Sequence, residues 1–68
     1  MVPIGTRVEI VDIVEPNLLG CLGFVARITE NRLDRPVIII TTDKRGRKMK
    51  PIMLDTSKLT RIELKLVF

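Results

Sequence analysis

The stretch "LGFVARIT", Leu22 to Thr29, alternates between two series of residues. One series is uniformly apolar, with Leu22, Phe24, Ala26 and Ile28, and the other is mixed, with Gly23, Val25, Arg27 and Thr29. Because successive side chains of a β-strand point to opposite faces, this alternation is typical of a strand with one buried face. The stretch therefore indicates a sheet protein.

Four other segments carry strand patterns, and β-branched residues are dense in them. We expect strands at Thr6–Val14, Val37–Thr42, Lys48–Leu54 and Thr60–Val67, in addition to Leu22–Thr29. The segment "PVIIITT" is apolar on both faces, which favours a central position in the sheet. The first strand breaks its alternation near Val11 and Asp12, which predicts a bulge or a bend. Pro51 cannot donate a ladder hydrogen bond, so it predicts an edge or a bulge in the fourth strand.

Short polar segments with turn residues separate these strands, so an antiparallel meander is the economical topology. In "LDTSKLT", the carboxylate of Asp55 is placed to cap one helical turn through Leu59. These elements predict a single all-β domain over residues 1–68, a small five-stranded antiparallel barrel with one short helical turn before the last strand. The expected core consists of Val8, Ile10, Phe24, Ile28, Ile39, Leu59, Ile62 and Leu64.

Two further stretches resemble a known family. "IGTRVEIVD" followed by "LLGCLGFVARI" is similar to the SH3-like barrels of the KOW and translation-protein type. The matching residues are Gly5, Val8 and Ile10, then Gly20, Gly23, Val25 and Ile28. "MLDTSKLTRIEL" resembles the helical turn and closing strand of those barrels. SH3-like barrels serve ribosomes, elongation factors, photosynthetic complexes and phage regulators, so the resemblance implies a fold without choosing a function.

Composition narrows the function classes. A chain of 68 residues, 46% of them hydrophobic, can bury one small core. Cys21 is the only cysteine, which excludes an internal disulfide and favours a reducing cytoplasm, and its expected role is that of a small apolar side chain. The first ten residues lack the long apolar run of a signal peptide or membrane span, so we expect a soluble protein with no membrane partner.

Catalytic and metal chemistry find little support in the sequence. There is no histidine to serve as a general base or zinc ligand, and Cys21 lacks a partner that would activate it as a nucleophile. The carboxylates Asp12, Glu15, Asp34 and Asp43 do not have the spacing of a calcium loop. We therefore expect a protein that is not an enzyme and that needs no metal or cofactor.

The stretch "DKRGRKMK", Asp43 to Lys50, is the main candidate for a binding site. Its basic residues are Lys44, Arg45, Arg47, Lys48 and Lys50. The net charge is +4, and without these five residues and Asp43 the chain has seven basic and seven acidic residues. A charge concentrated in this way predicts salt-sensitive binding to the phosphate backbone of DNA or RNA.

Three more basic residues extend this surface if they share its side of the molecule: Arg7, Arg27 and Arg61. With no Tyr or Trp and only two Phe, the chain cannot build an aromatic groove for polyproline or a stacking platform for single strands. The plainer alternative for "DKRGRKMK" is a solvated hairpin tip whose charges discourage edge pairing.

A second hypothesis belongs to another class of function. The chain can serve as a protein-interaction module or accessory subunit, in which Met49, Ile52 and Met53 form part of an interface and the basic tip docks on an acidic partner surface. A small regulator of transcription or translation, including one of phage type, satisfies both hypotheses. The sequence leaves the oligomeric state open.

Overall fold

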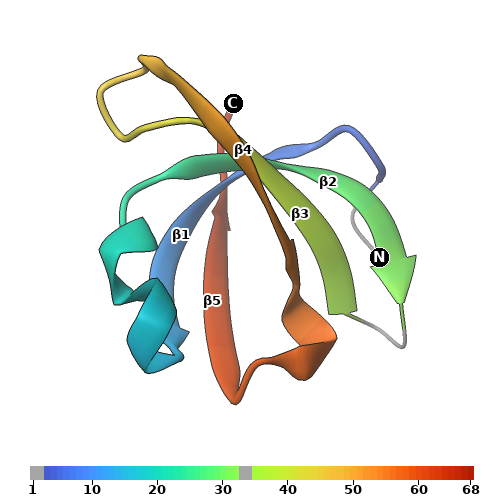
Figure 1. Ribbon diagram of the computed structural model, residues 1–68. Helices are drawn as coiled ribbons and strands as arrows, with labels where there is room; N and C mark the ends of the chain where they lie inside the picture. Colours follow the sequence, from blue (N-terminus) through green and yellow to red (C-terminus); the bar gives the residue numbers. More distant parts are fainter. Residues whose placement is uncertain (1–2, 33–34) are drawn as a thin grey trace.

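Five antiparallel strands build the molecule in the computed structural model, which describes residues 3–32 and 35–68 (Figure 1). The strands are β1 (Arg7–Val14), β2 (Val25–Arg32), β3 (Arg35–Thr42), β4 (Lys48–Asp55) and β5 (Arg61–Leu66). They form one sheet in the order β4-β3-β2-β1-β5. The first four strands are the predicted meander, whereas β5 returns to pair with β1.

The prediction of an all-β domain with five antiparallel strands is confirmed, but the sheet is open, so the predicted barrel does not form. Closure would need the two edge strands β4 and β5 to pair, and the described part of the chain joins β4 only to β3 and β5 only to β1. The strands nevertheless curve strongly, and β4 passes in front of the rest of the sheet in Figure 1. The physical reason lies in β4, where Pro51 has no amide hydrogen and Lys48 and Lys50 place charge on the edge.

The core lies inside this curved sheet. Its buried side chains are Val8, Ile10, Ile13, Cys21, Ala26, Ile28, Ile38, Ile40 and Leu54. The predicted core members Val8, Ile10 and Ile28 are confirmed, and four others pack against the core half-buried: Phe24, Leu59, Ile62 and Leu64. Ile39 is not part of this cluster, because Ile38 and Ile40 on either side of it face inward. Ile39 instead lies between Arg27 and Met53 in the register of the sheet.

The predicted bulge in β1 is confirmed and explains the uneven apolar pattern of that strand. The pairing of β1 with β5 shifts register between Ile10 and Asp12, so Val11 is the extra residue. One extra residue reverses the alternation of faces. As a result Ile10 and Ile13 both point into the core, and Val11 remains 43% exposed. A similar irregularity between Ile40 and Thr42 in the pairing of β3 with β4 flanks Pro51, as predicted.

Two short 3-10 helices complete the fold. The first, η1 (Pro16–Cys21), occupies a segment in which the sequence predicts only a turn. The second, η2 (Thr56–Lys58), is the predicted helical turn, and the side chain of Asp55 accepts a hydrogen bond from the amide of Ser57 at 3.1 Å. Among the described residues, no helix is long and apolar enough to cross a membrane.

The entry to β2 differs from the prediction by three residues. The strand begins at Val25 rather than at Leu22, because Gly23 adopts a φ of 83° and turns the chain before the ladder starts. The amide of Gly23 donates to the carbonyl of Ile10 at 2.8 Å, which fixes this turn on β1. The strand "PVIIITT", expected to be central, lies inside the sheet as β3, but the middle position belongs to β2.

Candidate nucleic-acid interface

The connection between β3 and β4, residues 43–47, is a tightly organised turn that we call the tip loop. The carboxylate oxygen Oδ1 of Asp43 accepts hydrogen bonds from the backbone amides of Arg45 and Arg47, both at 2.9 Å. The amide of Asp43 donates to the carbonyl of Arg47 at 2.8 Å, and the amide of Gly46 donates to the carbonyl of Asp43 at 2.9 Å. Gly46 has a φ of 84°, a conformation that favours glycine. The tip loop therefore holds one shape by its own hydrogen bonds.

Asp43 also offsets one of the positive charges of the tip loop. The amide hydrogen bond from Arg47 is the main cause that holds the pKa of the Asp43 carboxyl below its ordinary value, and the amide of Arg45 and the guanidinium of Arg47 act in the same direction. The carboxylate is thus ionised at neutral pH, and its Oδ2 lies 3.2 Å from Nε of Arg47. Of the five basic residues in this stretch, Arg47 is consequently engaged in holding the turn.

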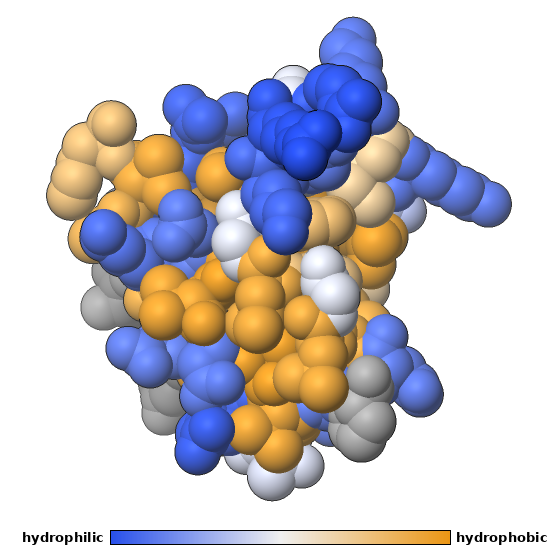
Figure 2. All heavy atoms as spheres, turned by 90° about the vertical axis from the view of Figure 1, so that its left-hand side faces the viewer, coloured by the Kyte–Doolittle hydropathy of each residue, from blue (hydrophilic) through white to orange (hydrophobic). Residues whose placement is uncertain are grey.

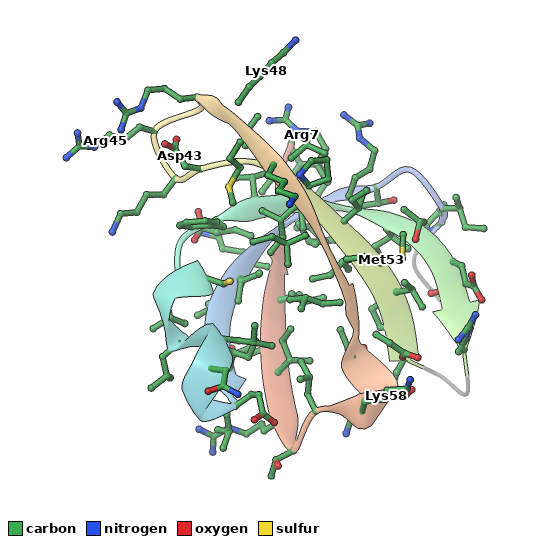
Figure 3. The ribbon with its side chains drawn as sticks, in the orientation of Figure 1. Arg7, Asp43, Arg45, Lys48, Met53 and Lys58 are labelled. Atoms are coloured by element: carbon green, nitrogen blue, oxygen red, sulfur yellow. The ribbon has the colours of Figure 1, made fainter. Side chains whose placement is uncertain are left out.

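The other four basic residues point outward. Lys44, Arg45, Lys48 and Lys50 are exposed, and none of them forms an ion pair within the described chain. Figure 3 shows Arg45 and Lys48 extending from the end of the molecule opposite to Lys58. The loop also lies against the entry to β2, since a Cβ placed on Gly23 would be 3.6 Å from Cδ of Lys44. The predicted basic tip thus consists of exposed side chains on a hydrogen-bonded turn.

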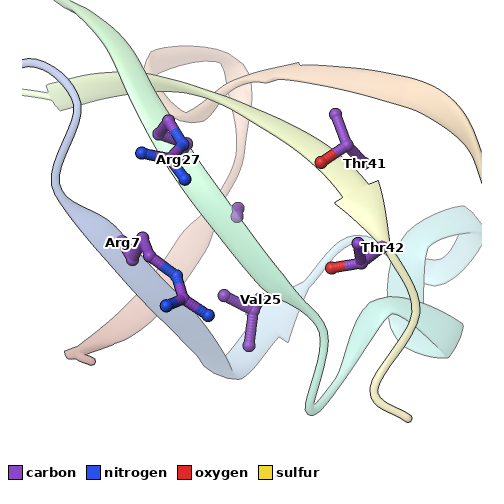
Figure 4. Close-up of a pocket in the computed structure, with 6 residues that line it drawn as sticks. Arg7, Val25, Arg27, Thr41 and Thr42 are labelled. Carbon is purple, nitrogen blue, oxygen red and sulfur yellow. The ribbon is translucent and has the colours of Figure 1, made fainter. Parts of the chain in front are cut away.

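Of the three additional arginines, the structure places Arg7 and Arg27 side by side and Arg61 elsewhere. Arg7 and Arg27 are direct partners across β1 and β2, and both are exposed. Together with Thr41 and Thr42 at the end of β3, they line a depression of about 130 Å³ beside the tip loop (Figure 4). Arg61 does not join this surface, because it begins β5 opposite Val14 and forms an ion pair with Asp12 at 2.6 Å.

The apolar residues of the alternative protein interface are only partly exposed to a partner. Met49 and Ile52 are half-buried and pack against the core, whereas Met53 is 65% exposed. Sequence reasoning missed Leu19 and Leu22, which are 54% and 39% exposed in and after η1. Figure 2 shows apolar side chains gathered below the basic tip on the side of the molecule that carries η1. The apolar run "LLGCL" is the signal that could have found them, but the glycine within it favours a turn.

A second hollow, of about 330 Å³, lies between Phe24 and the tip loop. Besides Phe24, its lining residues are Asp43, Lys44, Arg45 and Arg47.

Cys21 is 7% exposed, and burial raises the pKa of its thiol, so the thiol is protonated and weakly nucleophilic at neutral pH. Among residues 3–32 and 35–68, no group of three or more potential metal-ligating side chains was found.

Comparisons with protein-family models, with curated proteins and with solved structures find no match.

Proposed function

We propose that this protein is a small nucleic-acid-associated domain that binds the phosphate backbone of DNA or RNA through the basic end of the β3–β4 hairpin. The residues assigned to this role are Lys44, Arg45, Arg47, Lys48 and Lys50. The observation that carries the proposal is that the whole net charge of +4 resides in this one stretch, where four of the five basic side chains have no ion-pair partner within the described residues. Arg47 acts by shaping the loop.

The mode of binding follows from the chemistry of these side chains. Lysine and arginine side chains that meet several phosphates release counterions, so the affinity depends steeply on salt and little on base sequence. Phe24 is half-buried, which leaves Phe68 as the one fully exposed aromatic ring in the described chain. One ring offers little stacking for single strands, so duplex backbone is the better ligand.

The proposed context is an accessory factor or regulator of transcription or translation in the cytoplasm, with an SH3-like layout. Two features support this layout: the helical turn η2 directly precedes the last strand, and Gly23, with its positive φ, stands at the entry to β2. The open sheet differs from a fully closed barrel but keeps one shared core.

The test replaces Lys44, Arg45 and Lys48 by glutamine and leaves Asp43, Gly46 and Arg47 in place. The variant should fold as the wild type does, because the replaced side chains are exposed. Its affinity for duplex DNA and duplex RNA should fall together. The slope of log affinity against log salt should flatten by up to about 0.9 for each phosphate of B-form DNA that the variant no longer neutralises.

The matched control removes three basic charges at the opposite end of the hairpin and sheet, with Arg32, Lys58 and Arg61 changed to glutamine. It should retain most of the affinity if position matters and not only net charge. A wild-type protein that binds no duplex at low salt, where surface charges are least screened, would disprove the proposal.

The second candidate function is docking on an acidic protein surface. The exposed Leu19 and Leu22 beside the basic tip favour it, since apolar contacts flanked by charge are typical of protein interfaces. The test captures partners from a lysate before and after nuclease treatment. Capture that persists after the treatment and is abolished by Leu19→Ser with Leu22→Ser would favour this candidate over nucleic-acid binding.

A further inference from the structure

Arg7 and Arg27 form an unusual pair. They are direct cross-strand partners on one face of the sheet, and like charges in this position are destabilising. Neither arginine forms an ion pair with a carboxylate of the described chain. Nη1 of Arg27 donates to the carbonyl of Gly5 at 3.3 Å, which restrains the guanidinium without neutralising it. Local conflicts of this kind are expected at functional sites.

The surroundings of the two arginines offer hydrogen-bond donors. Thr41 and Thr42 lie across the depression, and Figure 4 shows their hydroxyl oxygens turned toward the arginine side. A guanidinium presents several N–H donors and no acceptor, and each hydroxyl can donate one more hydrogen bond. The depression offers about 130 Å³, whereas roughly 10 to 15 Å³ of such space is enough for one water molecule, so a group of several atoms can enter.

The number of donors favours phosphate over carboxylate. One guanidinium matches the two oxygens of a carboxylate in a bidentate pair. Two guanidinium groups with two hydroxyls instead suit the larger set of oxygens that a phosphate presents. The depression also borders the tip loop, because Thr42 lines it, directly precedes Asp43 and pairs with Lys48 in the register of the sheet.

We propose that the depression between Arg7 and Arg27 is a phosphate-binding subsite. It receives one backbone phosphate of a nucleic acid whose neighbouring phosphates contact the tip loop. The nucleic-acid strand would therefore cross the sheet from β4 over β3 and β2 to β1. This inference rests on the proposed function, and it adds a defined anchoring point outside the basic stretch.

The first experiment measures binding of a 20-base-pair duplex, a length chosen only as a probe of roughly two helical turns, by fluorescence anisotropy over a range of salt concentrations. Arg7→Gln with Arg27→Gln should lower the affinity by about tenfold at low salt, as expected when charged hydrogen bonds are removed. The salt slope should flatten by about 0.9, which corresponds to one phosphate.

The matched control, Lys58→Gln with Arg61→Gln, removes two charges far from the depression and should change the affinity by less than about twofold. Equal losses of affinity in the two variants would overturn the subsite.

The same arginine variant should melt at a temperature equal to or above that of the wild type, since it removes two like charges that face each other. A clear fall in melting temperature would show that the arginine pair stabilises the fold and would overturn the reasoning from repulsion.

The second experiment separates the subsite from the proposed function. Inorganic phosphate is titrated into the wild-type protein while the side-chain Nε–H resonances of its arginines are followed by NMR, with sodium chloride at matched ionic strength as the control. The resonances of Arg7 and Arg27 should shift at lower phosphate concentration than that of Arg61. If all three respond alike, the subsite is disproved even when the protein binds duplex. If phosphate shifts the pair but no duplex binds, the subsite is supported and the proposed function is wrong.

Discussion

At the scale of single residues, a few side chains decide what the basic stretch can do. The five basic residues can be identified from the sequence, because charge is visible without a fold. The engagement of Arg47 by Asp43 was not predicted, since it depends on the closed shape of the tip loop. Arg7 and Arg27 stand far apart in the chain, and only the register of β1 with β2 brings them together.

Gly23 gives a prediction at this scale. Its φ of 83° is a conformation that side chains with a Cβ rarely adopt, so Gly23→Val should lower the free energy of unfolding by about 1 to 3 kcal/mol. Urea titration measures the effect. Gly20→Ala is the control, because Gly20 has no positive φ and nothing lies within 4 Å of its added methyl group. Equal stability of the Gly23→Val variant and the wild type would refute the prediction.

At the scale of elements, all five strands can be predicted from the sequence, and the errors fall where local pattern and tertiary contact disagree. The isoleucine run of β3 is apolar on both faces, so its inward side cannot be chosen from the pattern, and the prediction that Ile39 lies in the core is wrong. Within η1, apolar Leu18 and Cys21 pack toward the core, which a turn assignment does not anticipate. The bulge at Val11 is predictable because a break in alternation is itself a local signal.

The element η2 gives the second prediction. Thr56 is fully buried, and its hydroxyl donates to the carbonyl of Pro36 in β3 at 2.7 Å, which fastens η2 to the sheet. Thr56→Val keeps the shape but leaves that carbonyl without its partner, so we expect a decrease of about 1 to 3 kcal/mol in the free energy of unfolding. Thr60→Val, at an exposed position, should stay within about 0.5 kcal/mol of the wild type in the same denaturation experiment. Similar decreases in both variants would contradict this role of Thr56.

At the scale of the whole molecule, two carboxylates link stability to acid. The amide of Arg47 is the main cause of the lowered pKa of Asp43, and the hydroxyl of Ser57 is the main cause of the lowered pKa of Asp55. A carboxyl whose pKa is depressed by folding contributes stability that is present above its unfolded pKa and is lost as the pH falls through its folded pKa. The ordinary value is 3.8, so this part of the stability should disappear as the pH is lowered below about 4.

Melting curves over this pH range give the measurement. The variant Asp43→Asn with Asp55→Asn keeps an oxygen that can accept the same amide hydrogen bonds but cannot titrate, so its melting temperature should fall less steeply with acid than that of the wild type. Glu63→Gln removes an exposed carboxylate and serves as the control. The prediction fails if the double variant and the wild type lose the same number of degrees between neutral and acid pH.

The pairing of β5 with β1 has a consequence for how the protein acquires its structure during synthesis. Strand β1 has β5 as one of its two neighbours, so the sheet is complete only when its first and last strands meet. Proteins dominated by such distant pairings fold slowly, in roughly milliseconds to seconds. A ribosome that has delivered β1 to β4 therefore holds a chain whose apolar β1 still lacks its second neighbour. Folding should finish only after β5 has emerged, and until then the unpaired edge of β1 exposes the nascent chain to aggregation.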